Sequence, residues 1–226
     1  MTRTQPTADE SGSAPAVDPP SAVESSLGYE RLVFFSDAVF AIAITLLVLP
    51  LTAEIELPET GRGLAHEVWA LWPTVLTFAV SFLVIGQFWI AHHRTFAYVR
   101  RHDTGLIWCN LVALLTVAFV PFPAALLGAH PTAEDAFPVV FYAASLTLTS
   151  AAMTGTWLYA VHGRLVDEAL SAEDRDTVTR RAFATTAVFA LSIGAALLGL
   201  PAAVACWLIV LPAVRLLAAR RRAAPS

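Results

Sequence analysis

The sequence predicts an all-α membrane protein with six transmembrane helices per subunit. Three observations carry this prediction: the composition, a series of apolar segments of spanning length, and arginines gathered in alternate loops. Apolar residues make up 57% of the 226 residues, charged residues only 14%, and the mean hydropathy is +0.64. A soluble domain carries about 25% charged residues. A spanning helix takes about 20 apolar residues, so six spans need roughly 120 and leave about 100 for tails and loops.

The elements follow in order from the amino end. Residues 1–28 are rich in Ser, Pro, Ala, Asp and Glu and contain no aromatic residue, which predicts a disordered cytoplasmic tail. Residues 29–220 form the predicted six-helix transmembrane domain, and residues 221–226 form a basic cytoplasmic tail end. The first four predicted spans are Leu32–Leu51, Val68–Ala91, Leu106–Leu127 and Phe137–Val161.

The last apolar stretch, from Ala182 to Ala219, predicts two further spans. As one helix it would extend roughly 57 Å at 1.5 Å per residue, nearly twice the hydrocarbon core of about 30 Å. The Gly199-Leu200-Pro201 step is the natural turn between the two spans.

Arginines and acidic residues occupy opposite sets of loops. Because positively charged loops stay in the cytoplasm, the arginine-bearing loops and both termini are predicted to lie inside. The acidic loops carry Glu54, Glu56, Glu59, Glu67, Glu134 and Asp135, with Arg62 alone against them. The basic loops and tail carry Arg94, Arg100, Arg101, Arg164, Arg175, Arg180, Arg181, Arg215, Arg220, Arg221 and Arg222.

Cysteines and histidines give weak signals for other chemistry. The two cysteines, Cys109 and Cys206, lie far apart in apolar stretches and predict buried free thiols rather than a metal or redox site. His92, His93 and His102 could ligate haem or a metal, or could serve in hydrogen bonding at the interface. The net charge of −4 gives no bias toward nucleic acid. We therefore expect no cofactor and no bound metal.

The first span holds the most informative residues. A carboxylate such as Asp37 is costly in a membrane helix, and it persists either at the shallow interface near Arg31 or in a buried polar network. Past Asp37 the helix is apolar, and one face carries residues at i, i+3, i+4 and i+7. Taken alone, such a stripe is more often simple packing. Its members are Ile42, Thr45, Leu46 and Leu49.

Several segments together resemble the transmembrane protein 175 family of potassium channels, found in prokaryotes and in endosomes and lysosomes. The resemblance extends over most of the chain after residue 28, and its specific motifs lie in the first half. One departure is Ala38, where glycine is frequent in the family. The matching segments are Arg31-x-x-x-Phe35-Ser36-Asp37, Val39-Phe40-Ala41-Ile42, Thr45-Leu46-Leu47, Trp89-x-x-His92-His93-Arg94-x-Phe96, Trp108-x-Asn110-Leu111 and Pro121-Phe122-Pro123.

The resemblance implies a single-repeat prokaryotic member that assembles as a homotetramer, with the first helix of each subunit lining a central pore. The pore-facing family positions fall on Ile42, Thr45, Leu46 and Leu49. The Phe-Ser-Asp element would lie near the cytoplasmic mouth and hold the first helix through hydrogen bonds. The implied polar network comprises Arg31, Phe35, Ser36, Asp37, Asn110 and His93, with His92 as the alternative histidine.

The leading hypothesis is a potassium-preferring cation leak channel in the prokaryotic cell membrane. The chain contains no TVGYG loop, so its selectivity must come from side chains, with apolar rings stripping water from the ion. The expected partners are the lipid bilayer, permeant cations and other copies of the chain, and an enzyme is not expected. A proton-conducting channel or secondary transporter of the same fold is the alternative, followed by a haem-binding membrane oxidoreductase.

Overall fold

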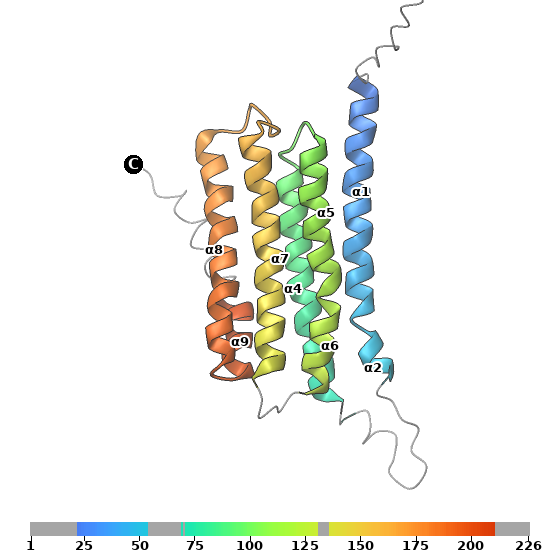
Figure 1. Ribbon diagram of the computed structural model, residues 1–226, viewed down its shortest axis with the longest axis vertical. Coiled ribbons are helices and arrows are strands. Elements are labelled where there is room, and N and C mark those ends of the chain that lie inside the picture. The colour runs from blue at the N-terminus through green and yellow to red at the C-terminus, as the bar shows by residue number, and fades with distance from the viewer. Residues whose placement is uncertain (1–21, 54–68, 70, 131–135, 211–226) are drawn as a thin grey trace, which may run out of the picture.

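The computed structural model describes residues 22–53, 69, 71–130 and 136–210, and its elements within these ranges are helical (Figure 1). The helices are α1 (Ala22–Leu46), α2 (Leu49–Ala53), α4 (Trp72–Phe96), α5 (Thr104–Phe119), α6 (Pro121–Ala129), α7 (Phe137–His162), α8 (Ala172–Ala196) and α9 (Leu200–Ala205), with a π-helical turn η1 at Cys206–Val210.

Four helical segments are long and apolar enough to cross a membrane within the described ranges: Leu27–Thr52, Trp72–Phe96, Thr104–Ala129 and Phe137–His162. They correspond to the first four predicted spans. The next helix, α8, begins with charged residues, and its apolar part runs only from Ala182 to its end. The sixth predicted span starts with α9 and η1 and continues outside the described residues. A six-span subunit therefore stays a prediction.

The first helix begins earlier than the sequence analysis placed it. Residues 22–28, assigned there to the disordered tail, already belong to α1. The prolines of the tail end at Pro20, and nothing between Ala22 and Gly28 prevents the helix from extending beyond its apolar part. The rest of that tail and the basic tail end lie outside the described residues.

Prolines determine where two of the spans are interrupted. Pro50 has no N–H to donate to the carbonyl of Leu46, and α1 ends at Leu46 before α2 resumes at Leu49. In the same way Pro121 cannot donate to the carbonyl of Val117, and α5 gives way to α6 there. Each interruption leaves one continuous span with a local change in helix geometry.

Caps and a glycine turn define the other helix ends. The Asp103 carboxylate accepts a hydrogen bond from the backbone N–H of Leu106, and the Ser171 hydroxyl accepts one from that of Asp174. Gly199 has φ 111°, a conformation that favours glycine, and it reverses the chain between α8 and α9. The predicted turn at Gly199-Leu200-Pro201 is therefore confirmed.

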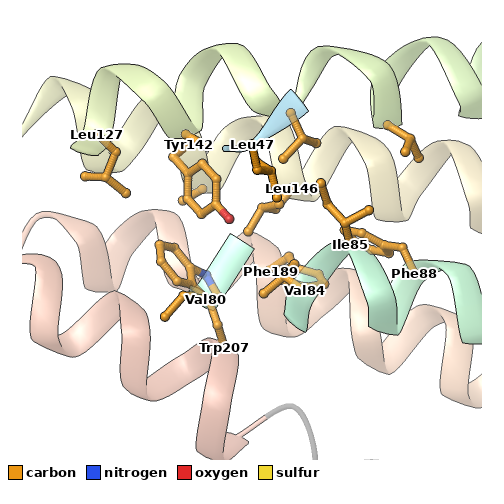
Figure 2. Close-up of a cluster of buried hydrophobic side chains, with 14 of the residues drawn as sticks. Leu47, Val80, Val84, Ile85, Phe88, Leu127, Tyr142, Leu146, Phe189 and Trp207 are labelled. Carbon is orange, nitrogen blue, oxygen red and sulfur yellow. The ribbon is translucent and has the colours of Figure 1, made fainter. Parts of the chain in front are cut away.

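The helices run roughly parallel to one axis, with α1 along one edge and α8 along the opposite edge (Figure 1). The main core takes buried side chains from α1, α4, α5, α6, α7, α8, α9 and η1. Figure 2 shows part of this core, in which side chains of α4, α7, α8 and η1 point toward one another. They include Val80, Val84, Ile85 and Phe88 of α4, Tyr142 and Leu146 of α7, Phe189 of α8, and Trp207 of η1.

Two loops meet at the end of the bundle where α4 and α7 finish and α5 and α8 begin, which we call the arginine-rich end. Val99 and Val166 form an antiparallel bridge there. The Arg100 guanidinium donates to the Asp167 carboxylate at 2.9 Å. The backbone N–H of Ala169 and, after it, Arg100 lower the pKa of Asp167. The α4–α5 and α7–α8 connections are thereby joined.

Candidate ion pathway and polar network

The first helix presents two different faces. Ser36, Phe40, Ala43 and Leu47 recur at helical spacing, and each is at most 3% exposed. They form the face that packs on α4 and α5, the long helices that α1 contacts. The spacing of these buried residues fixes the rotation of α1, so the side chains on the other face must point away from the bundle.

The predicted pore-lining residues lie on that other face. Ile42 is 58% exposed, Leu49 is 55% exposed and Leu46 is 40% exposed, and Thr45 is exposed as well. Large apolar side chains that one subunit leaves uncovered require lipid or another protein surface. The four residues therefore lie together on an uncovered face of α1. Their role in conduction stays a prediction.

Ile42 and Leu49 are not joined by a continuous helix. The seven-residue spacing that predicted one face crosses the interruption at Leu47 and Val48. The backbone there continues through a bond from the N–H of Val48 to the carbonyl of Thr45 at 3.2 Å. Leu49 stays exposed after the interruption, but a straight-helix estimate of its position relative to Ile42 does not apply.

The Thr45 hydroxyl has a defined orientation. It donates to the backbone carbonyl of Ile42 at 2.9 Å, within its own helix. A hydroxyl has one donor and two acceptor lone pairs, so this bond leaves oxygen lone pairs on the exposed face. Thr45 can therefore offer an oxygen ligand on the exposed face of α1.

A buried hydrogen-bond relay connects α1, α5 and α4. Ser36 and Asn110 are 0% exposed, and His92 is 4% exposed. The Asn110 side-chain amide donates to the Ser36 hydroxyl oxygen at 2.9 Å. The ring Nε2 of His92 lies 2.8 Å from the Asn110 carbonyl oxygen. We call these three side chains the relay.

The relay has one consistent direction of donation. The Ser36 hydroxyl donates to the carbonyl of Leu32 at 2.9 Å, so its oxygen accepts from Asn110. The amide oxygen of Asn110 is then the acceptor for His92, whose Nε2 must carry the proton. Nδ1 of the neutral ring is left as an acceptor. It is buried and has no hydrogen-bond partner among the described residues.

Asp37 has a partner that the sequence analysis did not consider. The indole Nε1 of Trp89 donates to its carboxylate at 2.8 Å, and Asp37 is half-buried at the edge of the α1–α4 contact. The candidate partners for Asp37 were Arg31, Ser36, His93 and Asn110. The spacing Trp89-x-x-His92 would have placed the indole on the same face of α4 as the relay histidine.

The remaining predicted network residues lie outside the relay. Arg31 is exposed and Phe35 is 50% exposed. Of the two histidines that the sequence left open, His92 is the one that contacts Asn110, whereas His93 is exposed and lies beside Trp89, with ring centroids 5.7 Å apart. The His92 ring stacks on Phe96, which sequence reasoning placed in the motif without a role.

Comparisons with known proteins agree with the motifs of this region. A family model described as "Endosomal/lysosomal potassium channel TMEM175" matches residues 31–121. A Streptomyces collinus protein named as a potassium channel is 37% identical over 177 residues, covering 76% of this chain and 84% of that protein.

A solved structure and an animal relative match as well. The crystal structure of a lysosomal potassium-selective channel TMEM175 homolog from Chamaesiphon minutus superposes with a TM-score of 0.72 at 28% identity, covering 85% of this chain and 98% of that one. A Homo sapiens protein named as the endosomal/lysosomal proton channel TMEM175 is 31% identical over 103 residues, which are 45% of this chain and 20% of that protein.

Proposed function

This chain belongs to the TMEM175 family of ion channels, and we propose that it is a potassium-preferring cation leak channel that conducts along α1. It is a multi-pass membrane protein with the TMEM175 channel fold. The oxidoreductase alternative loses its basis, because the family consists of channels. The constriction on α1, the four-copy assembly and the orientation in the membrane are parts of this proposal.

The observation that carries the proposal is the open face of α1. One rotation of the helix is fixed by Ser36, Phe40 and Leu47, and it turns the four stripe residues away from their own subunit. Four copies of the chain arranged around an axis would place these faces together. Apolar rings at Ile42 and Leu49 would strip water from a passing ion, and the Thr45 hydroxyls would replace part of that water.

The proposed orientation places the arginine-rich end in the cytoplasm. Arg94, Arg100, Arg101 and Arg164 gather at this end and are all exposed. Positive residues near span ends favour the cytoplasmic side. Ser36 of the relay lies in the half of the span Leu27–Thr52 that is nearer the arginine-rich end, so the relay would hold the pore helix near the cytoplasmic mouth of the prokaryotic cell membrane.

The experiment is the reversal potential of the purified full chain in planar bilayers under potassium/sodium bi-ionic conditions. We expect Ile42→Ala to raise sodium permeability relative to potassium, because a wider ring no longer strips the ion. Thr45→Val should lower the potassium preference without abolishing current, since only the hydroxyl is lost. Leu191→Ala is the control, because Leu191 is 71% exposed on α8, far from α1.

Two results would contradict this assignment. A shift in reversal potential for Leu191→Ala but not for Ile42→Ala would show that α1 does not form the constriction. A chain that carries no cation current in any condition would remove the channel function itself. The human relative named as a proton channel supports a second candidate function. A pH gradient at equal potassium on both sides tests it, and a reversal potential that follows the proton gradient would favour proton conduction.

A further inference from the structure

A cavity near the arginine-rich end has the features of a binding site. Its volume is about 530 Å³, and α4, α7 and α8 provide most of its lining. Small-molecule sites in proteins occupy about 300–1,000 Å³ and combine apolar walls with a few polar groups. This cavity is separate from the exposed α1 stripe, because none of the stripe residues lines it.

The charges around the cavity are of one sign. Its lining includes Arg94 and Arg181, and no acidic residue occurs among the described residues that line it. The Nε of Arg181 is buried and has no hydrogen-bond partner within the described part of the chain. A buried guanidinium donor without an acceptor is costly. An anionic group placed between the two arginines would remove that cost.

His92 requires a hydrogen-bond donor from the ligand, whereas the two arginines require an acceptor. Its ring also lines the cavity, and the relay fixes its Nε2 as a donor to Asn110. Nδ1 is therefore a buried acceptor that lacks a donor within the described residues. A ligand that satisfies all three side chains carries an anionic group and, beside it, a hydroxyl.

The apolar part of the lining selects an amphiphile over a soluble anion. Phe88, Ile90, Met153 and Trp157 contribute to the walls. A free phosphate would satisfy the arginines and leave this apolar surface uncovered, whereas an acyl chain would cover it. Basic pockets between spanning helices on the cytoplasmic side are typical sites for anionic lipid head groups.

We propose that this cavity binds one anionic phospholipid with a hydroxyl-bearing head group, such as phosphatidylglycerol. Its phosphodiester lies between Arg94 and Arg181, a head-group hydroxyl donates to Nδ1 of His92, and an acyl chain covers the apolar wall. Because His92 belongs to the relay that holds α1, the lipid contacts the same hydrogen-bonded unit that positions the pore helix. The site does not depend on which ion the channel conducts.

The test is native mass spectrometry of the purified full chain titrated with lipid in detergent. Phosphatidylglycerol should bind and phosphatidylcholine should not. Each arginine beside an anionic head group contributes about five-fold, so Arg94→Ala/Arg181→Ala should weaken binding about thirty-fold. The matched control is Arg101→Ala/Arg180→Ala, which removes the same charge from exposed positions outside the cavity.

Other arms of the experiment separate competing occupants. Phosphatidylmethanol has the same charge without the head-group hydroxyl, and equal binding of the two lipids would overturn the role given to His92. Displacement of the lipid by inorganic phosphate alone would assign the site to a soluble anion. If both double variants lost the same affinity for phosphatidylglycerol, the binding would depend on general surface charge, and the proposed site would be contradicted.

The last arm of the experiment tests whether the segment 211–226 of the same chain occupies the cavity. Efficient disulfide formation between Ala182→Cys and Ala218→Cys, with both native cysteines replaced by alanine, would assign the cavity to the segment 211–226 and overturn the proposal. We expect no such disulfide, and we expect phosphatidylglycerol to protect Ala182→Cys from thiol-reactive reagents.

Discussion

Replacement of Asn110 by alanine tests whether the relay holds α1 in place. Asn110 is the central member, and it is the acceptor for His92 and the donor to Ser36. Its loss leaves a buried imidazole N–H without an acceptor, which costs about 1–3 kcal/mol, and it removes a second hydrogen bond worth about 1 kcal/mol. We therefore expect Asn110→Ala to lower the free energy of unfolding by about 2–4 kcal/mol.

The assay is thermal unfolding of the purified full chain in detergent. A loss of about 3 kcal/mol corresponds to a decrease in Tm of roughly 6–12 °C for a chain of this size. Thr149→Ala is the matched control, because Thr149 is 0% exposed and, within the described part of the chain, its hydroxyl donates inside its own helix to the carbonyl of Ser145. Its Tm should fall by much less.

A double-mutant cycle separates the hydrogen bond from the loss of volume. His92→Phe removes the donor that Asn110→Ala leaves without an acceptor. The double variant should therefore be more stable than the sum of the two single effects predicts, by about 1–3 kcal/mol. Additive effects, or a Tm for Asn110→Ala equal to that of the Thr149→Ala control, would refute the claim that the relay stabilises the position of α1.

Three further changes address other contacts. Trp89→Phe removes the indole donor to Asp37 and should lower both Tm and current, whereas an unchanged current would limit this bond to packing. Ser171→Ala should destabilise α8 by about 1 kcal/mol through loss of its N-cap, and Ser171→Asn, which keeps a capping oxygen, should restore the Tm. Because the folded pKa of Asp167 is lowered, its stabilising effect is present above the ordinary carboxyl pKa of about 3.9 and is lost as the pH falls through the lower folded value. The difference in Tm between the wild type and Asp167→Asn should shrink over that acid range, and a constant difference would contradict the linkage.

The sequence predicted those features that depend on local patterns. The apolar segments predicted the long helices, and the Gly199 turn was placed correctly because glycine followed by Leu-Pro permits little else. The open face of α1 could also be predicted from helical spacing, since Ser36 and Phe40 lie on one side and Ile42 on the other.

The features that depend on contacts between helices could not be predicted in this way. Asp37 bonds to Trp89, and indole rings near span ends are common enough that composition gives Trp89 no special role. Whether His92 or His93 faces inward depends on the rotation of α4, which adjacent positions in one sequence do not fix. The interruption before Leu49 needed only the chemistry of Pro50, and that signal was present in the sequence but unused.

The distribution of bonds along α1 has a mechanical consequence. Among the described residues, its side-chain bonds to the other helices are Tyr29 to the carbonyl of Phe96, the Ser36 relay and the Asp37–Trp89 bond. They lie in the half of the span Leu27–Thr52 that is nearer the arginine-rich end, where the two loops are bridged. Farther along, α1 rests on the bundle through non-directional apolar contacts. A tilt of α1 would therefore turn the helix about a point near Ser36. At 1.5 Å per residue, Ile42 lies about 9 Å from Ser36 along the helix. Leu49 lies farther along the span, beyond the interruption at Leu47 and Val48, so a small tilt of α1 displaces Leu49 farther than Ile42.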